Sequence, residues 1–419
     1  MNVTIDPKPL KGNLSVISSK SLSHRYVIAS SLADGLSRVH HVLASEDLVA
    51  TKEALSHFGI SFDGDFIYGG LKEYDQKVID CHESGSTLRF LIPLAMLFEE
   101  KITFIGQGRL PLRPLDVYKD VFLKKHLTFE QPVNQELPLT VKGPLKPGRY
   151  QVRGDVSSQF ITGLLFALPL LKEDSVIEIT TPLESKSYID LTLDVLTSFG
   201  IKIIDVPPFY YVPGNQTYQV RESSVEGDYS QAAFFMVAGV LSGPICLNNL
   251  YDQSKQGDKK VTSILQQMGA TLVFDNMNHQ VTIYPSQTHG IEIDLSDIPD
   301  LGPILMALAA VSQGTTHFTH AKRLRVKESD RIESMEKALR LLGVHVTSTE
   351  DEVWIEGRES LLGDVVLDGC NDHRIVMALA ILSIKASGKI TITGAEAIEK
   401  SYPTFFEDYR HLGGCIDES

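Results

Sequence analysis

One pattern occurs six times along the sequence, and this repetition constrains the fold more than any other feature. In each copy a short polar head leads directly into an apolar helix of small residues. The heads with their helices recur roughly every 65–72 residues, at positions 19–35, 84–97, 155–171, 227–241, 297–311 and 371–384. A chain of this kind is expected to fold from six similar units.

A second helix follows in each copy. It is amphipathic, and in five copies a glycine ends it before an apolar strand begins. A glycine just past a periodic helix is a common stop, because glycine enters the left-handed conformation without steric cost. The second copy has Leu127 after Lys125 and His126 in this place, without a glycine. The five glycines are Gly59, Gly200, Gly269, Gly343 and Gly413.

The two ends of the chain complement each other. After Gly413 only six residues remain, too few for the strands that follow the other copies, whereas residues 1–18 contain two spare strands at 3–5 and 14–17. We therefore predict one domain of residues 1–18 plus 227–419, and a second domain of residues 19–226. The chain crosses twice between them, which is typical of a hinge.

Composition limits the class of protein. With 419 residues, 43% hydrophobic and 22% charged, the chain suits a soluble protein with two cores. No apolar run reaches the ~18 residues of a membrane span, and the N-terminus lacks a signal sequence, so we expect a cytoplasmic location. The net charge of −14 argues against binding nucleic acid or anionic membranes. The four scattered cysteines suit reduced thiols, not a disulfide framework or a zinc site.

Cations stand at the helix starts of this acidic chain. A helix N-terminus carries about half a positive charge and prefers acidic residues, so a cation there is unfavourable unless an anion binds. The pattern predicts a pocket for phosphate or carboxylate ligands. No nucleotide-binding glycine motif and no zinc motif accompanies it, so we expect no metal. The cations at the helix starts are Lys20, Arg25, Arg89, Lys327, Arg331 and Arg374.

Nearly the whole chain resembles one known family. The motifs that carry the resemblance, in order, are Lys20-Ser21-x-x-x-Arg25, Arg113-Pro114, Val156-Ser157-Ser158-Gln159-Phe160, Ser185-x-x-Tyr188, Glu226-Gly227-Asp228, Ile298-Pro299-Asp300, Arg325-Val326-Lys327-Glu328-Ser329-Asp330-Arg331, Asn371-Asp372-His373-Arg374 and Lys400. They are similar to EPSP synthase (3-phosphoshikimate 1-carboxyvinyltransferase), of the enolpyruvyl transferases. The resemblance implies an α/β fold of two domains, each of three βαβαββ repeats in an inverse α/β barrel, with the active site in the cleft between them.

The resemblance also implies an activity of the shikimate pathway, which glyphosate inhibits. Phosphoenolpyruvate and shikimate 3-phosphate give 5-enolpyruvylshikimate 3-phosphate and phosphate, by addition and then elimination. The family uses no metal and no organic cofactor, and we expect a monomer. Because facing cations repel until an anion bridges them, we expect the domains to close on substrate.

Site residues are carried over by the resemblance, position by position. Asp300 is expected to be the base for the 5-hydroxyl, and Glu328 and Lys20 share the acid role. Those expected to hold shikimate 3-phosphate are Lys20, Ser21, Arg25, Ser157, Ser158, Gln159, Ser185, Tyr188, Asp300 and Lys327. Those expected to hold phosphoenolpyruvate are Lys20, Gly85, Arg113, Gln159, Arg331, Arg374 and Lys400.

Several of these residues also have a structural interpretation. Ser157, Ser158 and Asp300 could cap helices, and Arg89, inside an apolar helix, could tie that helix down by hydrogen bonds. Glu83 and Arg323 depart from the family pattern near the site and leave the kinetic constants and the response to glyphosate open.

Two other functions remain. UDP-N-acetylglucosamine 1-carboxyvinyltransferase shares the fold but has asparagine after the first lysine and a loop cysteine; here Ser21 follows Lys20 and no cysteine lies near Arg113. A non-catalytic anion-binding relative should have lost Lys20, Glu328 or Arg331, and all three are present.

Overall fold

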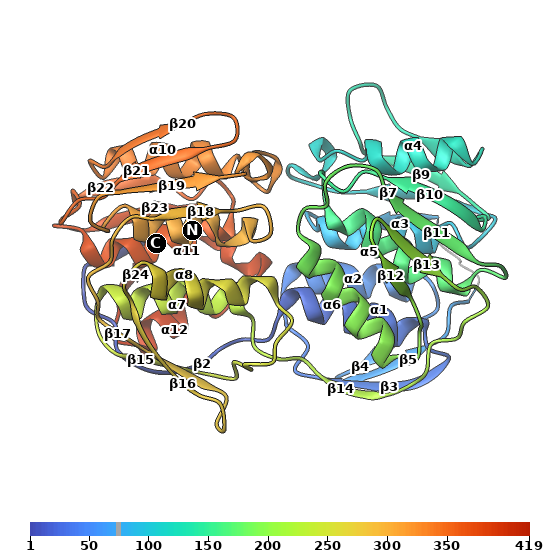
Figure 1. The fold of residues 1–419 in the computed structure, drawn as a ribbon, viewed down its shortest axis with the longest axis horizontal. Coiled ribbons are helices and arrows are strands. Elements are labelled where there is room, and N and C mark those ends of the chain that lie inside the picture. The colour runs from blue at the N-terminus through green and yellow to red at the C-terminus, as the bar shows by residue number, and fades with distance from the viewer. Residues whose placement is uncertain (73–76) are drawn as a thin grey trace. The chain divides into compact units, whose positions relative to one another are not determined.

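Six sheets of four strands each carry the six sequence copies (Figure 1). The computed structural model describes residues 1–72 and 77–419. In every sheet one pair of neighbouring strands is parallel and the other two pairs are antiparallel. The predicted α/β fold with six internal repeats is confirmed.

One compact unit comprises Lys20–Val225. Its helices are α1 (Lys20–Leu32), α2 (Glu46–Ser56), α3 (Gly85–Ala95), α4 (Asp116–Lys124), α5 (Ser158–Ala167) and α6 (Lys186–Ser198). Its strands are β3 (Gly35–His40), β4 (Ser61–Asp63), β5 (Phe66–Gly69), β6 (Val78–Asp80), β7 (Lys101–Ile105), β8 (Thr128–Glu130), β9 (Leu139–Lys142), β10 (Gly148–Val152), β11 (Ser175–Ile179), β12 (Ile204–Val206), β13 (Phe209–Val212) and β14 (Glu222–Ser224). The strand orders are β14-β3-β5-β4, β6-β7-β9-β8 and β10-β11-β13-β12, so the last strand of the unit pairs with its first.

The other unit comprises Met1–Ser19 and Glu226–Ser419. Its helices are α7 (Tyr229–Leu241), α8 (Lys260–Gln267), α9 (Gly302–Ala309), α10 (Arg331–Leu341), α11 (His373–Leu382) and α12 (Phe405–His411). Its strands are β1 (Asn2–Asp6), β2 (Gly12–Ser15), β15 (Ile245–Asn248), β16 (Thr271–Asp275), β17 (Gln280–Tyr284), β18 (Glu292–Asp294), β19 (Thr315–Thr319), β20 (His345–Ser348), β21 (Val353–Glu356), β22 (Val365–Asp368), β23 (Ile390–Thr393) and β24 (Cys415–Glu418). The strand orders are β16-β17-β15-β2, β18-β19-β21-β20 and β22-β23-β1-β24.

Strand β1 lies between the strands of the last copy. Its Val3 is opposite Ile392 of β23 on one side and Glu418 of β24 on the other. The two chain ends are therefore drawn close together in Figure 1. The N-terminal strand thus supplies the position that the short sixth copy leaves open.

The apolar helices form the two cores. All residues of α7 and α11 are buried, and both helices pack against α9. In the other unit α3 packs against α5 and is buried over nearly its whole length. Small side chains allow such helices to approach one another, and burying apolar surface yields about 25 cal/mol per Å².

The glycine stops have the backbone that the sequence predicts. The φ angles are 80° at Gly59, 83° at Gly200, 103° at Gly269, 83° at Gly343 and 100° at Gly413. In the second copy His126 takes the left-handed conformation instead, with φ 57°. A residue other than glycine can therefore end the helix there, at some conformational cost.

The predicted element ends differ from the structure in several places. Helices α3, α5 and α9 end before the predicted positions 97, 171 and 311. Pro169 explains the second case: its ring cannot continue an α-helix, so Leu168–Leu170 forms a 3-10 turn (η2). The N-terminal strands span 2–6 and 12–15 and not 3–5 and 14–17.

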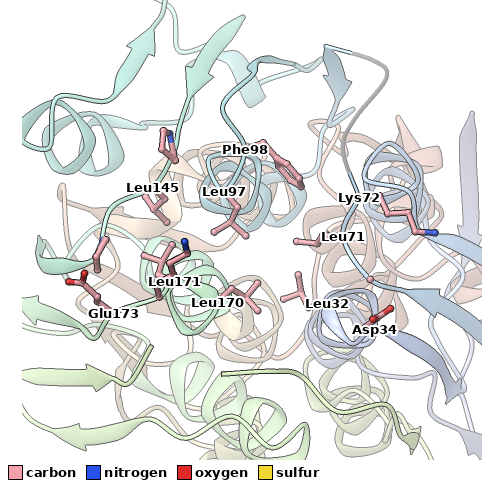
Figure 2. A pocket seen from close by; sticks show the side chains of 14 residues that line it. Leu32, Asp34, Leu71, Lys72, Leu97, Phe98, Leu145, Leu170, Leu171 and Glu173 are labelled. Atoms are coloured by element: carbon pink, nitrogen blue, oxygen red, sulfur yellow. The ribbon is translucent and has the colours of Figure 1, made fainter. Parts of the chain in front are cut away.

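A cavity of about 840 Å³ opens in the unit Lys20–Val225. Figure 2 shows apolar side chains around the cavity, among them Leu32, Leu97 and Leu170, which lie at or just after the C-terminal ends of α1, α3 and α5. Lys72 and Glu173 also line it. No residue of the predicted site lines this cavity. It lies at the C-terminal ends of helices whose N-terminal ends carry the predicted anion-binding residues.

The described residues hold no membrane-spanning helix, no metal-binding cluster and no disulfide. No described helix is long and apolar enough to cross a bilayer. Within residues 1–72 and 77–419, no three histidine, cysteine, aspartate or glutamate side chains gather as a metal site. All four cysteines lie in these ranges as free thiols.

Candidate active site

Arg331 is the centre of a buried charged cluster in the unit that contains residues 226–419. It is the first residue of α10, whose N-cap Asp330 accepts a hydrogen bond from the Glu333 N–H at 3.0 Å. The Arg331 side chain is 1% exposed. Burial lowers its pKa, but neighbouring carboxylates outweigh burial and raise the pKa, so the guanidinium stays charged.

Three carboxylates surround this guanidinium. Arg331 Nε donates to Asp372 Oδ2 at 2.8 Å, Nη1 to Asp300 Oδ1 at 2.9 Å, and Nη2 to Glu328 Oε2 at 2.7 Å and Asp372 Oδ1 at 3.3 Å. Since a guanidinium has five N–H donors, these contacts use four of them. Arg331 therefore holds both predicted proton-transfer carboxylates of this unit in fixed positions.

Asp300 lies among three cations. Its Oδ1 accepts from Lys327 Nζ at 3.2 Å and from Arg331, and Arg374 Nη2 lies 3.8 Å from Oδ2. Burial raises the pKa of Asp300, but the three cations outweigh burial and hold its pKa well below the usual value. Leu301, not Asp300, occupies the N-cap position of α9, so the capping interpretation of Asp300 is wrong.

Lys327 is strongly affected by the same surroundings. Burial lowers its pKa from the usual 10.5 to about 8, although Asp300 acts in the opposite direction. The ammonium group therefore loses its charge within about one pH unit of neutral, which is unusual for lysine.

Two further predicted residues, Arg374 and Lys400, lie in this unit's last repeat. Asp372 caps α11 by accepting a hydrogen bond from the Arg374 backbone N–H at 2.9 Å. Its carboxylate also accepts a hydrogen bond from Arg331 Nε. Arg374 Nη1 reaches the Ser230 carbonyl at 3.4 Å. Lys400 is 6% exposed and donates to the Asn371 carbonyl at 2.8 Å.

In the unit Lys20–Val225, Lys20 and Arg25 both lie on α1. Lys20 Nζ donates to Asp47 Oδ2 of α2 at 3.1 Å. Arg25 Nη1 donates to the Ser21 carbonyl at 2.7 Å and Nη2 to the Tyr188 carbonyl at 2.9 Å. Burial lowers the pKa of Arg25 to about 10, so it is still charged at neutral pH.

Gly85 and Arg113 are in direct contact. A Cβ atom at Gly85 would lie 2.5 Å from Arg113 Nη1, so any larger residue would displace the guanidinium. Gly85 is also the first residue of α3, whose cap Ser84 accepts the Thr87 N–H at 3.2 Å. The structure thus joins a helix N-terminus and a buried cation, the combination that binds anions.

Gln159 connects α5 to α3. Its amide oxygen accepts from Arg89 Nη1 at 2.8 Å, and its amide nitrogen donates to Ser86 Oγ at 2.9 Å. Ser157 caps α5 by accepting the Gln159 N–H at 3.3 Å. The capping interpretation of Ser157 and the tying interpretation of Arg89 are therefore confirmed.

Three predicted residues follow at neighbouring helix starts. Ser158 is the buried first residue of α5 and not its cap, so the capping interpretation of Ser158 is wrong. Ser185 occupies the cap position of α6, is fully buried and adopts φ 53°, a left-handed backbone. Tyr188 lies on α6 near Arg25, whose guanidinium carbon is 5.9 Å from the centre of its ring.

The predicted residues thus form one large cluster in one unit and several smaller groups in the other. Asp300, Lys327, Glu328, Arg331 and Arg374 gather around one guanidinium, and Lys400 lies beside Asn371. In the other unit the groups are Lys20 with Asp47, Arg25 with Ser21 and Tyr188, Gly85 with Arg113, and Gln159 with Arg89.

Some residues of these groups escaped the sequence prediction. Asp47 and Asp372 pair with predicted cations, and Thr192 Oγ1 accepts from Arg25 Nε at 2.9 Å. Asp372 stands inside a quoted motif and could have been found there, whereas Asp47 and Thr192 lie far from their partners in sequence.

Asp258 is a further buried carboxylate that the sequence did not predict. It accepts a hydrogen bond from the Ser230 hydroxyl, and burial raises its pKa to about 6.

Comparisons with known proteins identify the family of this chain. The family model of EPSP synthase (3-phosphoshikimate 1-carboxyvinyltransferase) matches residues 5–409. A Clostridium kluyveri relative named 3-phosphoshikimate 1-carboxyvinyltransferase is 47% identical, covering 99% of this chain and 98% of the relative. A Clostridium novyi relative of the same name is 43% identical, covering 100% of this chain and 98% of the relative.

Solved structures give the same result. The chain matches an EPSP synthase from Acinetobacter baumannii with a TM-score of 0.82 and 26% identity, covering 100% of both chains. The family motifs, the full-length relatives and the shared fold all agree. The chain therefore belongs to the EPSP synthase family and has 3-phosphoshikimate 1-carboxyvinyltransferase activity.

Proposed function

We propose that the charged residues described above hold phosphoenolpyruvate and shikimate 3-phosphate and carry out the proton transfers between them. The observation that supports this most strongly is the cluster in which Arg331 fixes Asp300 and Glu328 beside Lys327 and Arg374. Three carboxylates and three cations in one cluster around a buried guanidinium provide both proton-transfer groups and partners for anions.

The residues divide between the substrates as the sequence predicts. Shikimate 3-phosphate is assigned to Lys20, Ser21, Arg25, Ser157, Ser158, Gln159, Ser185, Tyr188, Asp300 and Lys327. Phosphoenolpyruvate is assigned to Lys20, Gly85, Arg113, Gln159, Arg331, Arg374 and Lys400. The contact between Gly85 and Arg113 supports the second set, because a helix N-terminus and a guanidinium both favour a carboxylate or phosphate.

The proposed chemistry has two steps. In the first step, Asp300 takes the proton of the 5-hydroxyl of shikimate 3-phosphate while the hydroxyl oxygen attacks C2 of phosphoenolpyruvate. Glu328 or Lys20 gives a proton to the methylene carbon of phosphoenolpyruvate. The resulting tetrahedral intermediate then loses a proton from the methyl group and releases phosphate, which restores the double bond.

The low pKa of Asp300 bears on this role, because a strongly acidic carboxyl is a weak base. The cations that lower it are Lys327, Arg374 and Arg331. The proposal gives these same cations to the anionic substrates, and an anion beside them offsets their effect. Asp300 therefore becomes a better base once both substrates are bound.

The alternative within the fold is the UDP-N-acetylglucosamine transferase. Ser21 after Lys20 and the absence of cysteine near Arg113 disfavour it. Phosphate release should be measured with phosphoenolpyruvate and either acceptor. We expect release with shikimate 3-phosphate alone; release with UDP-N-acetylglucosamine alone would reject the proposal.

Lys327 provides a pH-dependent prediction. With a pKa of about 8, its ammonium is charged below pH 8 and neutral above it. The kcat/KM for shikimate 3-phosphate should therefore fall as pH rises through about 8, by up to about tenfold per pH unit. The phosphate of the substrate does not explain such a fall, since its second pKa is about 6.

The variant Lys327→Arg isolates this effect. Arginine stays charged throughout the range, so the alkaline fall in kcat/KM should move to higher pH even if the absolute rate is lower. An unchanged alkaline limb in Lys327→Arg would show that another group titrates there.

Other expectations remain predictions. We propose that the enzyme is a cytoplasmic monomer, because its composition suits a soluble protein, and that it works without a metal or organic cofactor. The two-domain division and the closure of the domains on substrate also remain predictions.

A further inference from the structure

A chain of buried hydroxyls connects α1, α2 and α3 in the unit Lys20–Val225. His24 Nδ1 lies 2.9 Å from Thr51 Oγ1, which lies 2.7 Å from Thr87 Oγ1, and Thr87 Oγ1 donates to Ser84 Oγ at 2.7 Å. None of these four side chains is more than 1% exposed. We call these four residues the hydroxyl chain.

His24 is neutral at one end of the hydroxyl chain. Burial, together with Lys20 and Arg25, holds the pKa of His24 well below its usual value. Its Nε2 is buried and makes no hydrogen bond within the described residues. A bare nitrogen lone pair is less costly there than an orphaned N–H donor, so the proton belongs on Nδ1.

This tautomer sets the direction of the hydroxyl chain. His24 Nδ1–H donates to Thr51, so the Thr51 proton is directed to Thr87 and the Thr87 proton to Ser84. The Asp47 carbonyl competes only at longer distances, 3.1 Å from Thr51 Oγ1 and 3.3 Å from Thr87 Oγ1.

Ser84 is the last residue of the hydroxyl chain. Its oxygen accepts from Thr87 Oγ1 and from the Thr87 N–H, so its own proton is left for an acceptor outside the chain. Ser84 directly precedes Gly85, which touches Arg113. An anion at this helix start would be such an acceptor.

A separate hydroxyl network is associated with Arg25. Thr192 Oγ1 accepts from Arg25 Nε at 2.9 Å, donates to the Tyr188 carbonyl at 2.9 Å, and lies 3.0 Å from Thr162 Oγ1. No hydrogen bond joins this network to the hydroxyl chain among the described contacts. Arg25 and Tyr188 are both assigned to shikimate 3-phosphate.

We infer that the hydroxyl chain is a positioning device for phosphoenolpyruvate, in which neutral His24 orders Thr51 and Thr87 so that the Ser84 hydroxyl donates to this substrate. Ser84 is then a further binding residue, and His24, Thr51 and Thr87 act through it. The inference rests on the proposed assignment of Gly85 and Arg113 to phosphoenolpyruvate.

Steady-state kinetics of single variants test the inference. Thr51→Val keeps the shape of threonine but cannot pass on the hydrogen bond, and Ser84→Ala removes the donor. Each should raise the KM for phosphoenolpyruvate about tenfold or more, because hydrogen bonds to charged groups are among the stronger ones. The KM for shikimate 3-phosphate should stay within about twofold of the original value, since the second network is intact.

Substitution of His24 adds a rescue test. In His24→Asn the amide N–H can replace Nδ1–H and should largely preserve the KM for phosphoenolpyruvate, whereas His24→Leu should raise it as Thr51→Val does. A merely structural role would instead lower the melting temperature without selecting one substrate.

Two controls complete the design. Thr192→Val is the same chemical change in the other network and should raise the KM for shikimate 3-phosphate instead. Ser30→Ala removes a buried α1 hydroxyl without a hydrogen-bond partner among the described residues and should leave both values unchanged.

The outcomes separate the inference from the assignment beneath it. If Arg113→Ala leaves the KM for phosphoenolpyruvate unchanged, the substrate assignment fails and the inference with it. If Arg113→Ala raises that KM but Thr51→Val and Ser84→Ala do not, or if they raise both KM values equally, only the hydroxyl-chain inference is overturned.

Discussion

Replacing Asp300 by asparagine should lower the turnover rate by about 10²- to 10⁴-fold, the usual contribution of a general acid or base. Asparagine keeps the size of the side chain and an oxygen for Lys327 and Arg331, but it cannot accept the proton of the 5-hydroxyl. Affinity for shikimate 3-phosphate should stay within a few-fold. Calorimetry for binding and a phosphate-release assay for turnover separate the two quantities.

A matched control lies three residues earlier. Asp297 pairs with Lys260 on the surface, so Asp297→Asn is the same chemical change outside the cluster and should leave turnover unchanged. Normal turnover in Asp300→Asn, or a loss of affinity alone, would make Asp300 a binding group and place the base elsewhere.

Glu328→Gln extends the test to the acid. It should also lower turnover, and it should slow the uptake of deuterium from heavy water into the methylene group of phosphoenolpyruvate. If deuterium uptake is unchanged, the acid role falls to Lys20.

Replacing Arg331 by alanine should have the largest effect on stability. The change leaves Asp372, Asp300 and Glu328 without the guanidinium that compensates their charges, and removing one partner of a buried ion pair costs about 3–5 kcal/mol. Arg113→Ala makes the same change at another arginine that is assigned to phosphoenolpyruvate. Both variants should bind phosphoenolpyruvate far more weakly than before, with a smaller loss for shikimate 3-phosphate.

The pH dependence gives the stability effect a clear sign. In the unmodified enzyme, burial of Asp372 raises its pKa, but the charge of Arg331 outweighs the effect of burial. The pKa of Asp372 is therefore lower than usual. A carboxyl with a lowered folded pKa stabilises the fold above its unfolded pKa and loses this contribution as pH falls. Without Arg331 the pKa of Asp372 rises, so the stability deficit should be smaller near pH 4 than at pH 7.

Chemical denaturation at both pH values measures this. Arg325→Ala is the control, because its pair with Asp330 is partly exposed and should contribute at most about 1 kcal/mol. An equal deficit at both pH values, or equal losses of affinity for the two substrates in Arg113→Ala and Arg331→Ala, would contradict the assignment.

The repeating architecture could be predicted because it depends on local signals. Glycine stops such as Gly59 and Gly343 recur at the same place in five of the six copies, and their backbone requirement is independent of distant contacts. The predicted ends of helices were less accurate than the predicted glycine stops. At Pro169, for example, the apolar sequence continues but the backbone changes from an α-helix to a 3-10 turn. The fold class therefore followed from the sequence, whereas several element boundaries did not.

The site was predictable only in part. Motifs identified the cations and carboxylates, but not which of them meet. Arg331 was expected to bind substrate, but two of its carboxylate partners come from its own copy of the repeat and the third, Asp372, comes from the next copy. His24 and Thr51 are each one of several polar residues in α1 and α2, and nothing in a linear pattern shows that these two side chains touch.

The position of β1 between β23 and β24 also affects the order in which the chain can fold during synthesis. Residues 20–225 are contiguous, so this unit has all its strands as soon as β14 leaves the ribosome. The other unit needs β1, made first, to pair with β23 and β24, made last. Since domains fold as units during translation, the first strand has to wait, unpaired, until nearly the whole chain has been synthesised.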